Sequence, residues 1–283
     1  MKKSLLVTLA LSLVLVAAGC SKTTENTTEE VATEVEDATE AVEEDAAEAE
    51  YTAEAETETE ADTENAAAEG VMSYADYVAA DVDTEVCVET YVQAKQAWWE
   101  DNGVGQATFY TQNQDGAFFV YNLPCSQEDY DKLVPGTKIK VTGFKSEWSG
   151  EVEITDATYE IEDTDTFVAD AKDVTDLLGK DELIDYQNQF VSFKGMTVEA
   201  ANDAGDAFLY KWDGSGTEGD DLYFNVSLDG NTYSFTVESY LCDKDSDVYK
   251  AVQNLKVGDV VDMEGFLYWY EGVNPHITSI SVQ

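Results

Sequence analysis

The sequence predicts a mainly β fold: two tandem five-stranded barrels, each with a short helix between its third and fourth strands. One observation is a repeated phrase, since "LVPGTKIKVTGF" at 133–144 returns as "LKVGDVVDMEGF" at 255–266. A second is that "FYTQNQDGAFFVY" at 109–121 matches "YFNVSLDGNTYSF" at 223–235, in the same order along the chain. A third is the alternation of apolar and polar residues around both phrases, which is typical of strands. The alternative is two unrelated β domains.

The first segment, residues 1–19, has the pattern of a secretory signal peptide. Lys2 and Lys3 precede a short apolar stretch at 5–16, which is too short and wrongly flanked for a lasting transmembrane helix. The following "VAAGC" resembles the lipobox of bacterial lipoproteins. That resemblance implies a lipid on Cys20 and a protein anchored in the cell membrane, facing the extracellular or periplasmic side. The alternative is an ordinary signal peptide with a chance cysteine.

Residues 20–69 form an acidic low-complexity tether. The segment consists almost entirely of Ala, Thr, Glu, Asp and Val. Such a composition buries too little apolar surface to offset the entropy of ordering, and its like charges extend the chain. We therefore expect a disordered stalk, with a stable helix as the alternative.

The first copy occupies residues 70–164. A short helix at 73–80, capped by Ser73, precedes a strand at 85–92. A hairpin follows at 109–121, where Asp-Gly between alternating runs favours a tight turn. Next come a helix capped by Ser126, the strand of the repeated phrase, and a closing strand at 150–161.

The second copy occupies residues 165–283 and repeats this order. A connection at 169–189 with one or two helical turns leads to a strand at 190–198 and a hairpin at 223–235. A helix opened by Asp245 or Ser246 follows, and a strand at 274–282 closes the copy.

Five strands with a helix between the third and fourth is the order of the OB-fold, a small, partly open barrel. The phrases "PGTKIKVTG" and "VGDVVDMEG", with the hairpin before each, resemble OB-fold domains of secreted bacterial proteins and lipoproteins. The resemblance implies two tandem OB-fold-like barrels. It also implies a binding face on strands 2 and 3, between the loops that join strands 1–2 and 4–5.

Aromatic residues recur at these loops and strands, and flat rings stack on sugars, bases or peptide side chains. The alternative is that they fill the core. The candidate ligand-binding residues are Trp98, Trp99, Tyr110, Trp148, Trp212, Tyr268, Trp269 and Tyr270.

Two further site predictions concern metal and sulfur. Asp243, Asp245 and Asp247 have the spacing of a calcium loop, but Val248 stands where an EF-hand needs glycine, so a solvated acidic loop is the alternative. A bridge between Cys87 and Cys125 is one reading of the three cysteines that remain beside Cys20, and unpaired thiols are the other. No other cofactor is expected.

The net charge of the chain and its lack of catalytic motifs exclude several classes of function. A formal net charge of −45 repels polyanions and argues against nucleic acid. No Ser-His-Asp set, P-loop or GxGxxG supports an enzyme. The sequence therefore predicts a non-catalytic, lipid-anchored binding protein for an oligosaccharide, peptide or protein partner. The alternatives are a component of a cell-envelope assembly and, more distantly, a nucleic-acid-binding protein or a hydrolase.

Overall fold

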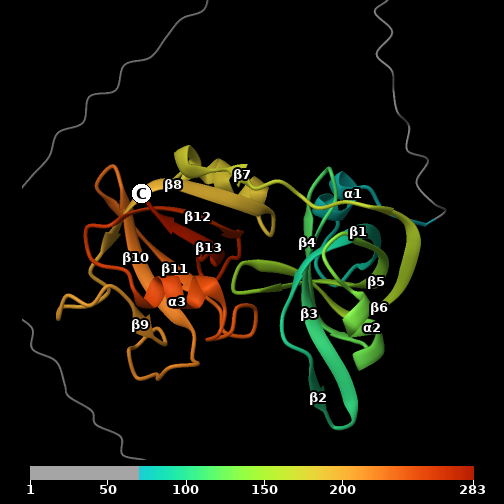
Figure 1. Cartoon of the computed structure of the whole chain (residues 1–283). Coiled ribbons are helices and arrows are strands. Elements are labelled where there is room, and N and C mark those ends of the chain that lie inside the picture. Colours follow the sequence, from blue (N-terminus) through green and yellow to red (C-terminus); the bar gives the residue numbers. More distant parts are fainter. Residues whose placement is uncertain (1–69) are drawn as a thin grey trace, which may run out of the picture. The chain divides into compact units, whose positions relative to one another are not determined.

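The structure, a computed structural model, describes residues 70–283 (Figure 1). The predicted signal peptide at 1–19, Cys20 and the tether at 20–69 lie outside the described residues. No helix within 70–283 is long and apolar enough to cross a bilayer.

The first barrel is a closed ring of five strands, in which β1 pairs with β5, β5 with β6, β6 with β4, β4 with β3, and β3 again with β1. A short strand, β2, extends β3 at one edge. The strands are β1 (Glu85–Lys95), β2 (Trp99–Asp101), β3 (Val104–Gln112), β4 (Ala117–Pro124), β5 (Thr137–Trp148) and β6 (Glu151–Thr166).

The second barrel closes by the same sequence of pairings, from β8 through β12, β13, β11 and β10 back to β8. Two short strands, β7 and β9, extend its edges. The strands are β7 (Lys172–Asp173), β8 (Phe190–Glu199), β9 (Leu209–Tyr210), β10 (Leu222–Leu228), β11 (Asn231–Val237), β12 (Val260–Phe266) and β13 (His276–Val282).

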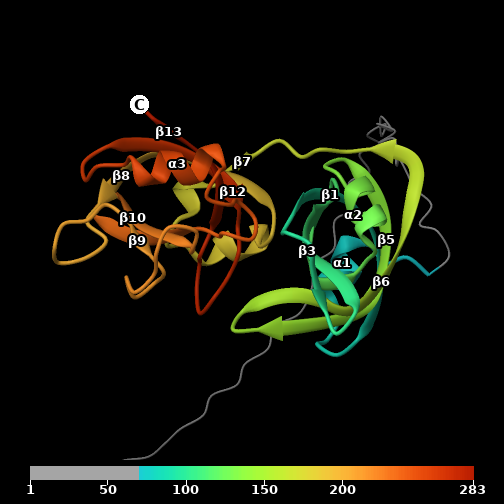
Figure 2. The ribbon, with the colours of Figure 1, turned by 60° about the horizontal axis from the view of Figure 1, so that its bottom comes forward.

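Both barrels have the OB-fold order, which confirms the predicted fold class. In each ring the third and fifth strands run parallel, β4 with β6 and β11 with β13, while the other pairs of the ring are antiparallel. The helix between strands 3 and 4 is α2 (Gln127–Lys132) in the first barrel and α3 (Asp247–Gln253) in the second. In Figure 2, α3 lies along β13, and α2 is tied to β6 by a hydrogen bond from the Tyr159 hydroxyl to Asp129, at 3.2 Å.

The helix starts follow from the capping residues. The Ser126 hydroxyl accepts from the Asp129 backbone N–H at 3.1 Å, and the Ser246 hydroxyl accepts from Tyr249 at 3.3 Å. Ser73 caps α1 (Tyr74–Ala79) in the same way. Of the two starts that the sequence left open for α3, the structure selects Ser246. The connection between the barrels forms two 3-10 helices, η1 (Thr175–Leu177) and η2 (Asp181–Tyr186).

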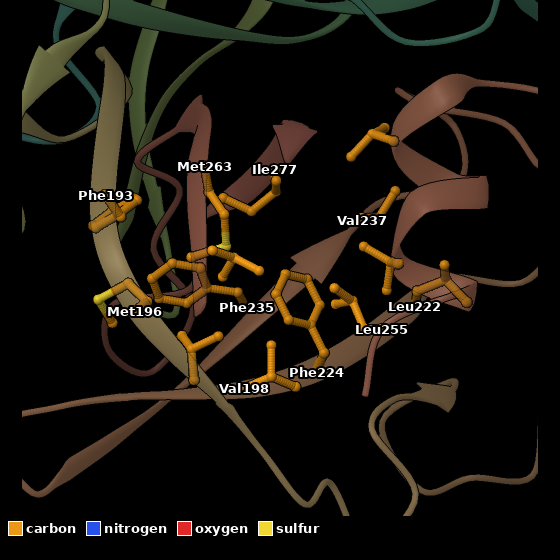
Figure 3. Packing of buried hydrophobic residues seen from close by; sticks show 14 of the residues in the cluster. Phe193, Met196, Val198, Leu222, Phe224, Phe235, Val237, Leu255, Met263 and Ile277 are labelled. Atoms are coloured by element: carbon orange, nitrogen blue, oxygen red, sulfur yellow. The ribbon is translucent and has the colours of Figure 1, made fainter. Parts of the chain in front are cut away.

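Each barrel encloses its own apolar core. Figure 3 shows the second core, in which Phe193, Phe224 and Phe235 pack together with Met263 and Ile277. In the first core Phe109, Phe118 and Ile139 are buried to the same degree. A third, smaller cluster joins the barrels through Tyr110 and Phe119 of the first and Phe266 of the second.

Candidate functional site

A cavity of about 670 Å³ lies beside β10, the end of β11 and the start of β13, near the face where OB-folds bind ligands. The loop before β10 and the loop between β12 and β13 border it, and the end of β5 in the first barrel adds one residue. Five aromatic residues line it: Trp148, Trp212, Tyr223, Tyr268 and Tyr270. Three carboxylates, Asp221, Glu238 and Glu271, and the polar residues Asn274 and His276 complete the wall. We call this set the aromatic–acidic pocket.

The rim of the pocket consists of exposed rings. Trp212 is 75% exposed, Trp148 is 55% exposed and Tyr270 is 43% exposed. The centroids of Trp148 and Tyr270 lie 5.1 Å apart with an interplanar angle of 36°. Large apolar rings held in water without a packing partner on one face are available for a ligand.

The loop between β12 and β13 is fixed to the first barrel. The Glu271 backbone N–H donates to the Ser149 carbonyl at 2.7 Å, and the Trp269 N–H donates to the Glu151 carboxyl at 2.9 Å. Glu271 has a φ of 53°, a left-handed conformation that a tight loop demands. These contacts hold Tyr270 against Trp148.

Two of the carboxylates are anchored by hydrogen bonds. Asp221 accepts from the Ser239 backbone N–H at 2.8 Å and from its hydroxyl at 2.6 Å. Glu238, which follows β11, accepts from the Gln96 side-chain amide at 3.0 Å and from the Tyr240 N–H at 3.2 Å. Burial raises the pKa of Glu238 to about 7, with the nearby Asp221 carboxylate as the next cause.

His276 forms part of the floor and is a neutral imidazole. Its Nδ1 lies 2.6 Å from the Tyr110 hydroxyl, and its ring stacks on Tyr268 with centroids 4.3 Å apart. Burial lowers the pKa of His276 to about 3, because the charged imidazolium would lose its hydration. The pocket therefore holds aromatic faces and carboxyl groups, and neither lysine nor arginine lines it.

The structure brings together half of the residues predicted from the sequence. Trp148, Trp212, Tyr268 and Tyr270 all line the pocket. Trp99 lies instead in a separate depression with Tyr121 and Tyr240.

The remaining three predicted residues pack inward. Trp98 packs on the first core and donates to the Cys125 carbonyl at 3.1 Å. Trp269 packs on the second core, and Tyr110 is fully buried between the barrels.

Sequence reasoning missed Tyr223 and all three carboxylates of the pocket. Tyr223 belongs to the second predicted hairpin. Its neighbour Phe224 is buried, so the alternation of side chains along a strand places Tyr223 on the outer face, and this signal could have identified it. The carboxylates had no distinguishing signal, because the chain contains 60 acidic residues.

The three aspartates of the predicted calcium loop are not gathered into a metal-binding group. Within residues 70–283 no group of three or more His, Cys, Asp or Glu side chains is placed to hold a metal ion. The Asp243 carboxylate instead accepts from the Asp245 backbone N–H at 3.0 Å, and Asp247 lies in the first turn of α3. Asp243 and Asp245 thus form a turn that leads into α3, where Asp247 lies in the first turn.

The bridge considered between Cys87 and Cys125 is not formed, since both are free thiols, as is Cys242. Cys87 lies on β1, which is flanked by β5 and β3, whereas Cys125 follows β4. The two residues are therefore not on neighbouring strands.

Searches against protein-family models and curated proteins find no match for this chain. Several solved structures are similar to it at low identity. The p204 HINb domain has 12% identity and a TM-score of 0.33, covering 72% of this chain and 100% of that one. A murine DNA-binding protein bound to double-stranded DNA has 12% identity and a TM-score of 0.34, covering 69% of this chain and 94% of that one. A replication protein A heterotrimer bound to single-stranded DNA has 12% identity and a TM-score of 0.29, covering 70% and 48%.

The names of these structures differ from the ligand predictions made from the sequence. Two of the three were solved with DNA bound, and none of the three names describes an enzyme. The sequence made nucleic acid an unlikely partner and favoured an oligosaccharide, peptide or protein ligand, and the DNA complexes among these structures stand against both predictions. What those proteins bind is a property of those proteins.

Proposed function

We propose that this tandem OB-fold protein binds a small organic cation, a quaternary or protonated amine, in the aromatic–acidic pocket, without catalysing a reaction. One observation carries the proposal: five aromatic side chains and three carboxyl groups line a single cavity to which no lysine or arginine contributes.

The chemistry of the wall matches such a ligand. The faces of Trp and Tyr rings attract cations, and quaternary ammonium groups are recognised by cages of such rings. Trp148 and Tyr270 present two of these faces beside each other. Asp221 and Glu271 add negative charge, which a cation entering from water neutralises.

The charge of the whole chain acts in the same direction. A formal net charge of −45 creates a negative potential that concentrates small cations near the surface. The cavity of about 670 Å³ also lies within the usual size range of small-molecule sites. It has room for an ammonium group with an attached chain.

The test compares choline with 3,3-dimethyl-1-butanol, which has the same shape but no charge. Calorimetric titration of the full-length chain should show choline binding at least about tenfold tighter than the neutral alcohol, since cation–π attraction and the carboxylates act on charge alone. Trp212→Ala and Tyr270→Ala should each weaken choline binding by about 5- to 30-fold. Trp99→Ala, which removes an exposed tryptophan outside the pocket, should leave it unchanged.

Equal binding of choline and the neutral alcohol would refute a cation site. A single-stranded oligonucleotide belongs in the same series. Oligonucleotide binding that is lost in Trp212→Ala, without choline binding, would assign the pocket to base stacking instead.

We also propose that the chain is a lipoprotein anchored through Cys20 on the outer side of the cell membrane. The "VAAGC" sequence after an apolar stretch supports this placement. Two acyl chains are enough for stable anchoring. Expression in a bacterial host with an alkyne fatty acid should label the wild-type chain but not Cys20→Ala. Equal labelling of both would contradict the anchor.

A further inference from the structure

Glu238 differs from the other acidic groups of the pocket because it is buried without a counter-ion. It is 9% exposed and lines the cavity. Its side chain accepts hydrogen bonds only from neutral donors, the Gln96 amide and the Tyr240 N–H. None of the ion pairs within residues 70–283 includes it.

The groups that surround Glu238 supply no positive charge. Asp221, just before β10, is an acidic neighbour and raises the pKa of Glu238. The imidazole of His276 on β13 is neutral. The other titratable neighbours are hydroxyl and thiol groups on the surrounding elements, namely Tyr110, Tyr223, Tyr268 and Cys242. An ionised Glu238 is therefore buried with two neutral hydrogen-bond donors and no positive charge to compensate it.

We infer that the pocket exchanges a proton for its cationic ligand: the free protein holds Glu238 partly as a neutral carboxylic acid, and this acid becomes a carboxylate when an ammonium group enters. This inference rests on the proposed function. The O–H bond of the acid breaks and the proton passes to the solvent, so that one positive charge leaves as another arrives. No oxidation or reduction is involved.

The exchange makes affinity depend on pH in a defined direction. Protons and the cation compete, so apparent affinity falls as pH decreases below the pKa of Glu238, which burial raises to about 7. A single group of this kind weakens binding about tenfold between pH 8 and pH 6. His276 does not contribute, because its pKa is lowered to about 3. The Cys242 thiol does not titrate between pH 6 and pH 8 either, because burial raises its pKa to about 12.

The experiment titrates choline into the full-length protein at pH 6, 7 and 8, in pairs of buffers with different ionisation enthalpies and at constant salt. We expect about tenfold tighter binding at pH 8 than at pH 6, and release of about half a proton per choline at pH 7. Glu238→Gln should bind choline with no pH dependence and no proton release.

Glu153→Gln is the matched control. Burial raises the pKa of Glu153 to about 7 as well, but this residue lies on β6 and does not line the pocket. The variant should keep the pH dependence and proton release of the wild type. A loss of both in Glu153→Gln would overturn the inference.

The outcomes separate this inference from the proposed function. Choline binding that is independent of pH and releases no proton overturns the exchange and leaves the cation site intact. Absence of choline binding at every pH overturns both. If Glu238→Gln does not fold, proton release by the wild-type protein and by Glu153→Gln still decides the question.

Discussion

Four glycines explain why the chain repeats one phrase. Gly136 and Gly258 have φ values of 91° and 92°, so each turns the chain into the fourth strand of its barrel in a conformation that favours glycine. Gly143 and Gly265 have a different role, since each lies where the fourth strand crosses closely over the fifth, at a shift in register. A Cβ atom on Gly265 would lie 2.2 Å from the His276 carbonyl oxygen. The repeated phrase thus encodes one turn and one close approach per barrel.

Gly265→Ala should therefore destabilise the protein by about 1–3 kcal/mol or more, because the atoms that must move belong to the backbone of β13. Urea denaturation measures the loss. Gly230→Asn is the control: Gly230 has a φ of 84° with open space around its Cα, and asparagine tolerates this conformation, so the change should stay within about 0.5 kcal/mol. An unchanged midpoint for Gly265→Ala would contradict the crowding argument.

At the scale of elements, a lysine on β5 fixes the short helix α1 on the first barrel. The buried Lys145 ammonium donates to the carbonyls of Tyr77, Val78 and Ala80 at 3.0, 2.9 and 2.7 Å. These carbonyls lie at the end of α1, where a helix leaves its last carbonyls short of donors, and the Tyr77 carbonyl also accepts from the Ala80 N–H at 3.3 Å. A six-residue helix is too short to be stable by itself. Its position therefore depends on this tertiary contact and on the packing of Tyr77 against Phe118.

The geometry of the two hairpins is set by the residues of their own turns. In the second barrel, Asp229 and Gly230 have φ values of 52° and 84°, and they join the directly paired Leu228 and Asn231. Positive φ at both central residues is the requirement of a tight two-residue hairpin. In the first barrel four residues separate the strands, and Asn113 caps the turn by accepting from the backbone of Asp115 and Gly116, both at 3.0 Å.

At the scale of the whole molecule, three carboxyl groups within residues 70–283 are buried without a counter-ion. Burial raises the pKa of Glu151 to about 8, and it raises those of Glu153 and Glu238 to about 7. One oxygen of Glu151 and the side-chain oxygen of Asn188 are buried without hydrogen-bond partners. Both are acceptors when Glu151 is ionised, and a proton on Glu151 turns its oxygen into a donor. The folded state thus favours protonated forms of these groups.

Stability should consequently decrease as pH rises from 6.5 to about 8.5. The unfolded chain loses these protons near pH 4.5, whereas the folded chain keeps them until about pH 7 to 8, so the folded state binds more protons in this window. Below pH 6.5 the unfolded chain protonates His276, whereas the folded chain keeps it neutral, so stability there rises with pH because of this residue. The range from pH 6.5 to 8.5 therefore isolates the effect of the three carboxyl groups. Thermal unfolding at constant ionic strength measures the slope, and Glu151→Gln should flatten it. A melting temperature that rises with pH across the window would refute this account.

The elements of this protein were determined by its sequence. Ser126 caps a helix, Asp229-Gly230 turns a hairpin, and alternating residues build strands through contacts a few positions apart, so each signal can be recognised without knowing the rest of the chain. The repeated glycines predicted two similar barrels because turns and close approaches impose the same requirement in both copies.

The site was decided by the tertiary structure alone. All four tryptophans Trp98, Trp148, Trp212 and Trp269 were equal candidates in the sequence. In the structure Trp98 and Trp269 pack on the cores, whereas Trp148 and Trp212 line the pocket. Alternation along a strand says that a side chain points in or out, but it does not say which loops of two barrels meet. Glu238 is one of 60 acidic residues in the chain, and only its burial beside Asp221, without a cation, distinguishes it. Burial and charge environment are set by residues far apart in the sequence, which no local pattern records.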